Sequence, residues 1–466
     1  MKQSFQNSVW AIRDARIALL ARALSTAGTS VTSIAAMLLL YDGGVGPLGV
    51  AAFLAALTIP TIATMGVAGR VADTMDSRVV LVTASLVQAT AVTALGVTHT
   101  TAVIFVTGIV IALAQAFEQP AWSALVPRIV GEDRIGPAIS WQQGLAAVAS
   151  PIGAGIGGLL VALDDVAWGF WADAATYVLL AGAALIIRTR RHGAAESATG
   201  AGATPGATSP VQGAPAVGAA SAVVDAVAVQ AAPPAARKRW SWAEGVRIVA
   251  RDRILMPLFA AILVFVVLVE GVNPVEVFLV RGPLGATDWQ YGLTELFAGA
   301  GGVIGAAVAG RVAGNHARAR AATIGFGSAA LIMVAVGLAP SFWVYAALIT
   351  ALIAAFGTGN AAFGALLTSR TPDALRGRVY APLNGLARTA SLIALGLGGT
   401  ANALVGPRTT FVTAGAAGVV VMVVAGLAVL RAQRAERAHT APPVQNSVEI
   451  DAEVPGEAET GPLGTG

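Results

Sequence analysis

Cysteine is absent from the 466-residue chain, and charged residues make up only 12% of it. The absence of cysteine excludes disulfides, thiolate metal ligands and a cysteine nucleophile. The four histidines lie far apart and form no pair with metal-ligand spacing. Lysine occurs only as Lys2 and Lys238, and neither follows a glycine, so the chain contains no P-loop. We therefore expect no cofactor, no metal, no nucleotide and no nucleic acid as a partner, and no enzyme activity, since no nucleophile and base form a recognisable set.

Hydrophobic residues make up 56% of the chain. An ordinary soluble domain has roughly a quarter of its residues charged, and a soluble fold could not bury as much apolar surface as this chain carries. Runs of about twenty apolar residues, each long enough to cross a hydrocarbon layer of about 30 Å as a helix, recur from end to end. The sequence predicts an all-α membrane protein embedded in the lipid bilayer. The twelve expected spans are 17–41, 46–68, 79–97, 101–123, 137–162, 166–187, 255–279, 288–311, 320–338, 342–368, 379–404 and 408–430.

The basic residues predict the orientation, because they favour the cytoplasmic side of a membrane. With the N-terminus inside, Arg281 and Arg408 are the only bases that fall in external loops, while Arg22 and Arg388 lie within spans. The polar start of the chain, 1–16, lacks a signal-peptide cleavage site and is expected to be a cytoplasmic arm. We predict a multi-pass protein of the bacterial inner membrane with both termini in the cytoplasm.

Composition divides the chain further. The segment 188–239 is rich in Ala, Gly, Pro and Ser, and such a segment is expected to be a flexible cytoplasmic linker. Residues 240–253 carry a capping-box pattern at Ser241 and Glu244 and predict an amphipathic helix on the inner membrane surface. The linker separates a six-helix bundle over 17–187 from a second over 254–431, and the acidic tail over 432–466 is expected to be disordered.

An internal repeat supports this division. "GRVADTMDSR" at 69–78 is echoed by "GRVAGNHARAR" at 310–320, and Arg128 and Arg134 are echoed 242 residues later by Arg370 and Arg376. Two echoes at nearly one offset indicate two six-helix halves related as parallel repeats.

The turn between spans two and three resembles a loop signature of the major facilitator superfamily, Gly-x-x-x-Asp-(Arg/Lys)-x-Gly-(Arg/Lys)-(Arg/Lys). Gly69, Asp73 and Arg78 match it, and Asp76 replaces the second glycine. That replacement, together with "TPDALRGRV" and "WADAATYVL", is similar to the branch of enterobactin-type and macrolide exporters, which are drug:proton antiporters. The resemblance implies a twelve-helix fold of two six-helix bundles that transports by alternating access.

In that family the charged turn latches the two halves in one state of the cycle, which the resemblance assigns here to Gly69, Arg70, Asp73 and Arg78. We expect a short Gly-led turn that lets spans two and three approach closely, with Asp73 at the positive end of a neighbouring helix. The alternative is a solvated turn that only obeys the positive-inside rule.

Span five contains "ASPIGAGIGGLL", which resembles imperfectly the Gly-Pro-x-x-Gly-Gly element of exporters. Glycines four apart permit close helix contact, and a proline weakens a helix locally. Pro151, Gly153 and Gly157 therefore predict either a pliant seam between the halves or ordinary helix packing. Span four lacks the arginine that many proton-coupled members carry.

Ionisable groups at membrane depth are costly and usually face a cavity or a partner. Glu270 lies about fifteen residues into span seven, near the middle of the bilayer, and Asn273 and Pro274 follow one turn later. A carboxyl group there can carry a proton or hold a cationic substrate. The alternative is an acid satisfied by neighbouring hydroxyls, by Arg22 or by Arg388.

Other polar residues within the spans are weaker candidates. Glu118 is placed at an inner vestibule or at the interface, and Arg22 either reaches the inner surface or heads a polar stripe along span one. Three acids in the outer parts of spans six to eight are expected to be structural or gate groups: Asp173, Glu276 and Glu295. Four amides are possible cavity residues: Gln88, Gln142, Gln143 and Asn360.

These patterns favour a secondary transporter that exports a small amphipathic or apolar compound, with inward proton movement as the driving force. A solute:cation symporter of the same fold and a membrane sensor or scaffold that no longer transports remain as alternatives. The second half departs from the loop signature, because Gly314 stands where the first half has Asp73.

Overall fold

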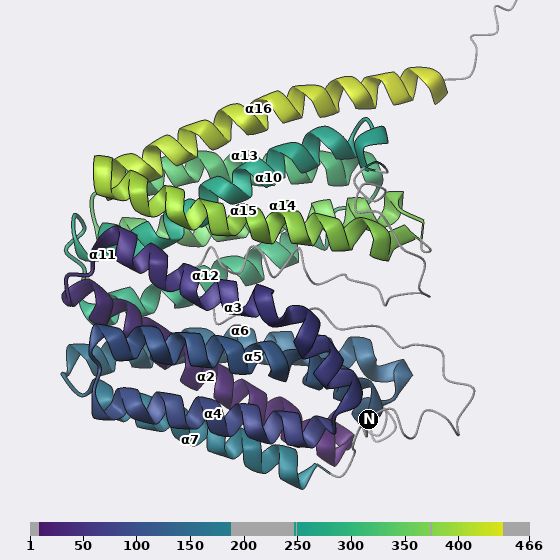
Figure 1. The fold of residues 1–466 in the computed structure, drawn as a ribbon. Helices are drawn as coiled ribbons and strands as arrows, with labels where there is room; N and C mark the ends of the chain where they lie inside the picture. The colour runs from purple at the N-terminus through teal and green to yellow at the C-terminus, as the bar shows by residue number, and fades with distance from the viewer. Residues whose placement is uncertain (1–8, 188–246, 248, 373–374, 441–466) are drawn as a thin grey trace, which may run out of the picture.

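A computed structural model describes residues 9–187, 247, 249–372 and 375–440 (Figure 1). The expected linker, most of the expected surface helix over 240–253 and the end of the tail lie outside the described residues. Every long element among the described residues is an α-helix, as expected.

The helices of the first half follow the expected spans closely. They are α2 (Arg13–Asp42), α3 (Gly46–Thr74), α4 (Ser77–Val97), α5 (Thr101–Val130), α6 (Ile135–Ala162) and α7 (Val166–Ile186). Two short 3-10 turns, η1 (Val9–Ala11) and η2 (Glu132–Arg134), precede α2 and α6.

The second half has the same number of spans. Its elements are α10 (Leu255–Val272), η4 (Asn273–Val275), α11 (Glu276–Arg281), α12 (Asp288–Ala309), α13 (Asn315–Gly337), α14 (Phe342–Arg370), α15 (Arg376–Val405) and α16 (Pro407–Thr440). The expected seventh span is broken at η4, where Pro274 interrupts the helical hydrogen bonding. By length and hydropathy, eleven spans of the described chain qualify as membrane-crossing, and α15, 30 residues long, takes the place of the twelfth.

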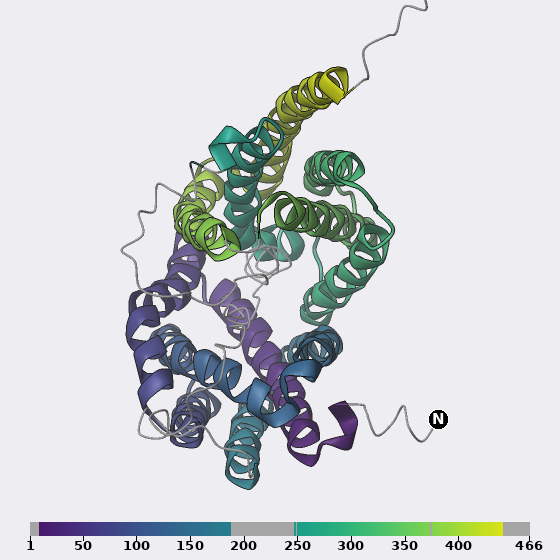
Figure 2. The same ribbon diagram turned by 90° about the vertical axis from the view of Figure 1, so that its right-hand side faces the viewer.

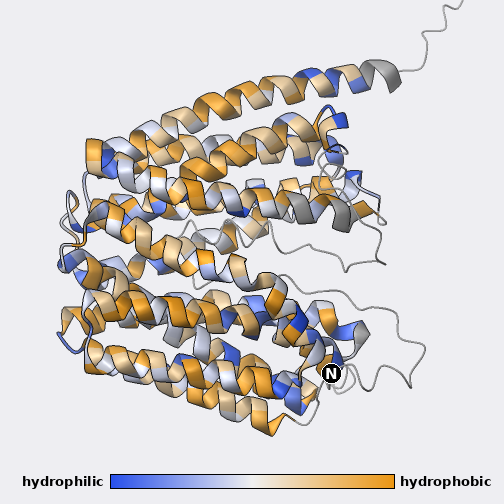
Figure 3. Ribbon diagram, viewed as in Figure 1, coloured by the Kyte–Doolittle hydropathy of each residue, from blue (hydrophilic) through white to orange (hydrophobic). Residues whose placement is uncertain are grey.

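The two halves pack side by side, with the start of α2 and the end of α16 on one side (Figures 1 and 2). We call the side that carries Arg13, Leu255 and Thr440 the terminal side, and the side that carries the loop between α2 and α3 the opposite side. Hydrophobic residues cover the middle of the helices and hydrophilic residues gather at their ends (Figure 3). This distribution is that of a multi-pass membrane protein.

The described halves meet at the opposite side. In the contact between α6 and α12, a Cβ atom at Gly158 would lie 2.6 Å from the carbonyl oxygen of Asp288 and 2.9 Å from Cα of Gly292. In the contact between α3 and α15, a Cβ atom at Gly399 would lie 3.1 Å from the carbonyl oxygen of Pro47. Both contacts use the ends of helices at the opposite side, so the halves are closed there.

An aromatic contact and an ion pair strengthen this closure. The ring of Tyr41, at the end of α2, lies 5.3 Å from that of Phe278 on α11. Arg281 lies 3.6 Å from Asp42 of the first half and 2.8 Å from Asp288 of its own half. Toward the terminal side, α3 is open, because Cβ atoms at Gly66 and Gly69 would meet nothing within 4 Å.

Several expected boundaries were wrong by five residues or more, including the end of span four at 123, since α5 continues to Val130. We expected the turn after span two to begin near Gly69, but α3 continues to Thr74 and the turn is confined to Met75 and Asp76. We also expected a disordered tail from 432, whereas α16 continues to Thr440. Contacts of Gln433 and Glu436 with other helices stabilise this extension.

Candidate functional site

A buried acid and arginine form the centre of a polar cluster in the first half. Arg22 of α2 lies 3.6 Å from Glu118 of α5, and its guanidinium sits 5.2 Å from the centre of the Trp122 ring. Glu118 accepts hydrogen bonds from Gln88 of α4 at 2.7 Å and from the Trp122 indole at 3.2 Å, and Arg22 donates to Gln119 at 3.3 Å. Glu118 is only 6% exposed, because these side chains enclose its carboxylate. The cluster links three helices through one carboxylate.

A second polar cluster surrounds Asp173 of α7, which is completely buried. Thr32 of α2 donates a hydrogen bond of 2.6 Å to one carboxylate oxygen, and Thr176 lies 3.2 Å from the other. Thr29 and Tyr177 share a further hydrogen bond of 2.8 Å between the same two helices. Asp173 therefore joins α2 to α7 within one half, which agrees with a structural role better than with a gate.

Small spaces adjoin both clusters. A cavity of about 40 Å³ between α2, α3, α4 and α5 is lined by Thr29, Thr32, Thr107 and Gln115 among apolar residues. It has room for two or three water molecules at about 15 Å³ each. A smaller space of about 20 Å³ is lined by Arg22, Trp122 and Gln142, which places that amide beside the arginine cluster.

In the second half, two buried acids flank the break in the seventh span. Glu270, 3% exposed, lies in the last turn of α10, and the amide of Asn273 lies 3.5 Å from its carboxylate. Glu276 begins α11 and accepts a hydrogen bond of 2.6 Å from the Tyr345 hydroxyl of α14. The carboxylates of Glu270 and Glu276 and the amide of Asn273 therefore lie about one helical turn apart along the broken span.

The helix that carries Glu270 lies against α15 with no side chain between them. A Cβ atom at Gly398 would overlap the carbonyl oxygen of Gly271. The structure therefore places Glu270, the acid preferred from the sequence, beside a backbone contact between two helices.

Two other candidates lie elsewhere in the second half. Asn360 of α14 is buried, and Glu295 of α12 is half-buried.

The residues of the expected latch lie at the terminal side of α3 and at the start of α4. Asp76, not Asp73, caps α4 by accepting the backbone N–H of Arg78 at 2.9 Å. The guanidinium of Arg78 donates to the carbonyl of Ile187 at 2.7 Å and so joins α4 to the end of α7. The expected Gly-led approach of spans two and three is wrong, because a Cβ atom at Gly69 would meet nothing within 4 Å. Arg70 reaches back to the carbonyl of Gly66 at 3.4 Å.

The glycines of α6 serve two different contacts. Cβ atoms at Gly153 and Gly157 would lie closer than 3 Å to backbone atoms of α2, so these glycines pack α6 within its own half. Pro151 instead faces Gly299 of α12, where a Cβ atom would lie 3.0 Å from the proline ring. The seam between α6 and α12 is therefore formed by Pro151 and Gly158.

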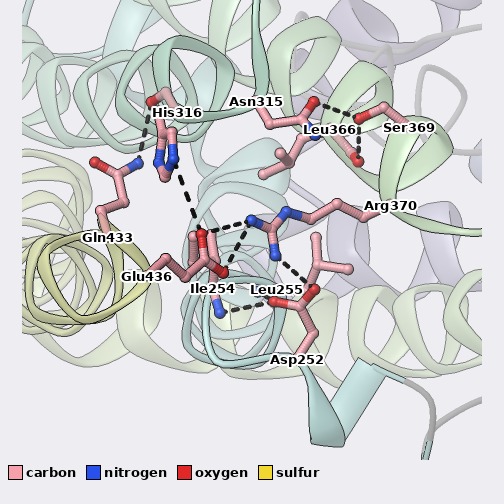
Figure 4. A network of polar contacts seen from close by, with 10 residues as sticks. All are labelled: Asp252, Ile254, Leu255, Asn315, His316, Leu366, Ser369, Arg370, Gln433 and Glu436. Atoms are coloured by element: carbon pink, nitrogen blue, oxygen red, sulfur yellow. Dashed lines mark hydrogen bonds and ion pairs between the residues drawn. The ribbon is translucent and has the colours of Figure 1, made fainter. Parts of the chain in front are cut away.

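A network of polar contacts at the terminal side ties together α10, α13, α14 and α16 (Figure 4). Arg370 donates to Asp252 at 2.8 Å and to both carboxylate oxygens of Glu436 at 3.0 and 3.1 Å. Asp252 also accepts the backbone N–H groups of Ile254 and Leu255 and so caps α10. Burial opposes ionisation of Asp252, but these N–H groups and the arginine outweigh it and lower the pKa of the carboxyl group.

Sequence reasoning missed several members of these clusters. Trp122 follows Glu118 by four residues and therefore shares its helix face, a signal that could have identified it. Tyr345 and Glu436 carry no comparable signal, because their partners lie 69 and 66 residues away along the chain.

Comparison with known proteins identifies the family. The sequence profile of the Major Facilitator Superfamily matches residues 18–381. The chain belongs to this superfamily. It is a membrane transporter and not an enzyme. No curated protein sequence matches it.

Solved structures resemble the chain in fold. A bacterial homologue of the iron transporter ferroportin in its inward-facing state has a TM-score of 0.62 at 14% identity, over 90% of this chain and 98% of that chain. A POT family transporter in complex with 5-aminolevulinic acid has a TM-score of 0.60 at 12% identity, over 89% and 96%. The nucleoside transporter NupG has a TM-score of 0.60 at 10% identity, over 89% and 99%. At these identities the likeness shows the fold alone.

Proposed function

We propose that this protein exports a small amphipathic or apolar compound across the bacterial inner membrane, driven by inward movement of protons. Transport proceeds by alternating access of the two halves around a site between them. With both termini in the cytoplasm, closure at the opposite side corresponds to an inward-facing state.

The observation that carries the proposal is the burial of carboxylates within apolar helices. Glu270 lies at the end of α10 beside Asn273 and next to the backbone contact between α10 and α15. An acid at that position can take up and release a proton when the helices move relative to each other. Glu270 is the preferred proton carrier.

The pair formed by Arg22 and Glu118 is the second candidate. Protonation of Glu118 would remove the negative partner of Arg22 and weaken the hydrogen bond from Gln88. Proton uptake there would change the contacts between α2, α4 and α5. Gln142, beside Arg22, and Asn360 are proposed as polar contacts for substrate.

The latch is proposed for the other state of the cycle. When the halves close at the terminal side, the open face of α3 around Gly69 becomes the contact, with Arg70, Asp73 and Arg78 forming polar contacts to the second half. The contact between Arg281 and Asp42 at the opposite side must then break.

Inverted membrane vesicles test direction and coupling together. After a proton gradient is established, a panel of dyes and antibiotics is added and the gradient is followed with a pH-sensitive dye. Dissipation that depends on the protein and on a compound supports export. Uptake of the same compound into whole cells would support a symporter instead, and no effect in either assay would contradict a transport function.

A further inference from the structure

The packed pair of helices α13 and α16 presents an exposed face at the terminal side of the second half. The helices are held together by contacts such as Thr323 with Gly426 and the hydrogen bond of 3.2 Å from Arg320 to Gln433. Beside this contact, each helix exposes a row of apolar residues that ends in arginine.

On α13, Arg320 is followed by Ile324 and Leu331, which are 68% and 62% exposed. Residues spaced by four and seven lie on one face of a helix. On α16, the exposed row ends in two exposed bases, and its members are Val420, Val424, Leu427, Arg431 and Arg434.

Both rows lie on the same side of the helix pair. At about 100° per residue, the exposed row of α13 is displaced by roughly a quarter turn from Thr323, and that of α16 by roughly a third of a turn from Gly426, both in the same rotational sense. Because the helices run antiparallel, displacements in the same sense point to the same side. The two rows therefore form one continuous face with three arginines at its terminal end.

The depth of the arginines matches a membrane surface. Arg431 and Arg434 lie about 36 and 40 Å along α16 from its first residue, at 1.5 Å per residue, whereas the hydrocarbon core is about 30 Å thick. They extend beyond the hydrocarbon to the level of the headgroups, with the apolar rows at the depth of the acyl chains. The nearby acid, Glu436, accepts hydrogen bonds from Arg370 on another face of α16.

We propose that this face binds an anionic phospholipid. Arg320, Arg431 and Arg434 hold the phosphate and headgroup, and the acyl chains lie along the apolar rows. Charge complementarity selects the anionic lipid, because basic side chains at the end of membrane helices attract negative headgroups by about 1 kcal/mol each.

The test measures lipid binding to the purified full-length protein by native mass spectrometry. Phosphatidylglycerol and phosphatidylcholine with identical acyl chains are added in turn after delipidation. The wild type is expected to prefer phosphatidylglycerol. In the Arg431→Gln/Arg434→Gln variant, the ratio of the two lipid affinities is expected to fall by about 30-fold. Two contacts of about 1 kcal/mol are removed, and 1.4 kcal/mol corresponds to a factor of ten.

The matched control is Arg16→Gln/Arg311→Gln, which removes two exposed bases of the terminal side that lie outside this face. It is expected to keep the wild-type preference, as is Arg431→Lys/Arg434→Lys. Equal binding of the two lipids by the wild type would overturn the proposal, and so would an equal loss in the control. If the glutamine variant does not fold, the salt dependence of lipid binding to the wild type tests the proposal. Added salt is expected to weaken the binding of phosphatidylglycerol but not that of phosphatidylcholine. The readout is independent of transport.

Discussion

The glycine seam between α6 and α12 gives a prediction whose magnitude follows from the structure. A Cβ atom at Gly158 would lie 2.6 Å from the Asp288 carbonyl oxygen and 2.9 Å from Cα of Gly292, so a side chain there cannot fit without moving backbone. Gly158→Val should destabilise closure at the opposite side by about 1–3 kcal/mol, the usual cost of overpacking. The ratio of the two states should change by about 5- to 150-fold.

Distances between spin labels measure this change. Gly144 of α6 and Ala306 of α12 are exposed and lie on the same helix faces as the seam, seven residues nearer the terminal side than Pro151 and Gly299. Because the chain has no cysteine, Gly144→Cys/Ala306→Cys can be labelled without other changes. Closure of the terminal side should bring the labels together, so Gly158→Val should increase the population at short distance.

A matched control is available on the same helix. A Cβ atom at Gly155 would meet nothing within 4 Å, so Gly155→Val should leave the distance distribution as it is in the wild type. The same distance distribution in Gly158→Val and Gly155→Val would show that the contact of Gly158 does not hold the opposite side closed.

Three further predictions concern charged residues. Glu118→Ala should lower the free energy of unfolding by about 3–5 kcal/mol, because it leaves Arg22 without its buried carboxylate partner, and thermal unfolding in detergent measures the loss. Asp42→Asn should favour opening at the opposite side by only about 1 kcal/mol or less, because the contact with Arg281 is partly exposed; the spin labels measure this shift. Asp252, whose pKa is lowered, stabilises the fold at neutral pH and loses this effect as the pH falls below about 4, so Asp252→Asn should flatten the decline of melting temperature in acid.

Local features of the fold could be predicted from the sequence. Runs of apolar residues end at charged or Gly-containing turns, and the membrane fixes the length of a helix, so α4 and α7 begin and end within two residues of the expected spans. The break near Asn273 coincides with Pro274, which has no backbone N–H to continue the helical hydrogen bonding. The extension of α16 could not be predicted, because its polar residues are held by contacts with residues distant in the sequence, among them Arg320, Arg370 and His316.

The contacts between residues of the candidate site could be identified only from the structure. Arg22 and Glu118 are 96 positions apart, and their pairing depends on which faces of α2 and α5 meet. The same limit applies to the glycines of α6. Gly153 and Gly158 look equivalent in the sequence, but one contacts its own half and the other contacts the second half.

The central claim is that a proton moves through Glu270 as a compound is exported. Purified protein in liposomes, with an imposed pH gradient, measures this most directly with a compound identified in the vesicle screen. We predict that Glu270→Gln abolishes gradient-driven accumulation but retains exchange of labelled for unlabelled compound without a gradient. Gradient-driven transport at the wild-type rate in Glu270→Gln would contradict the claim.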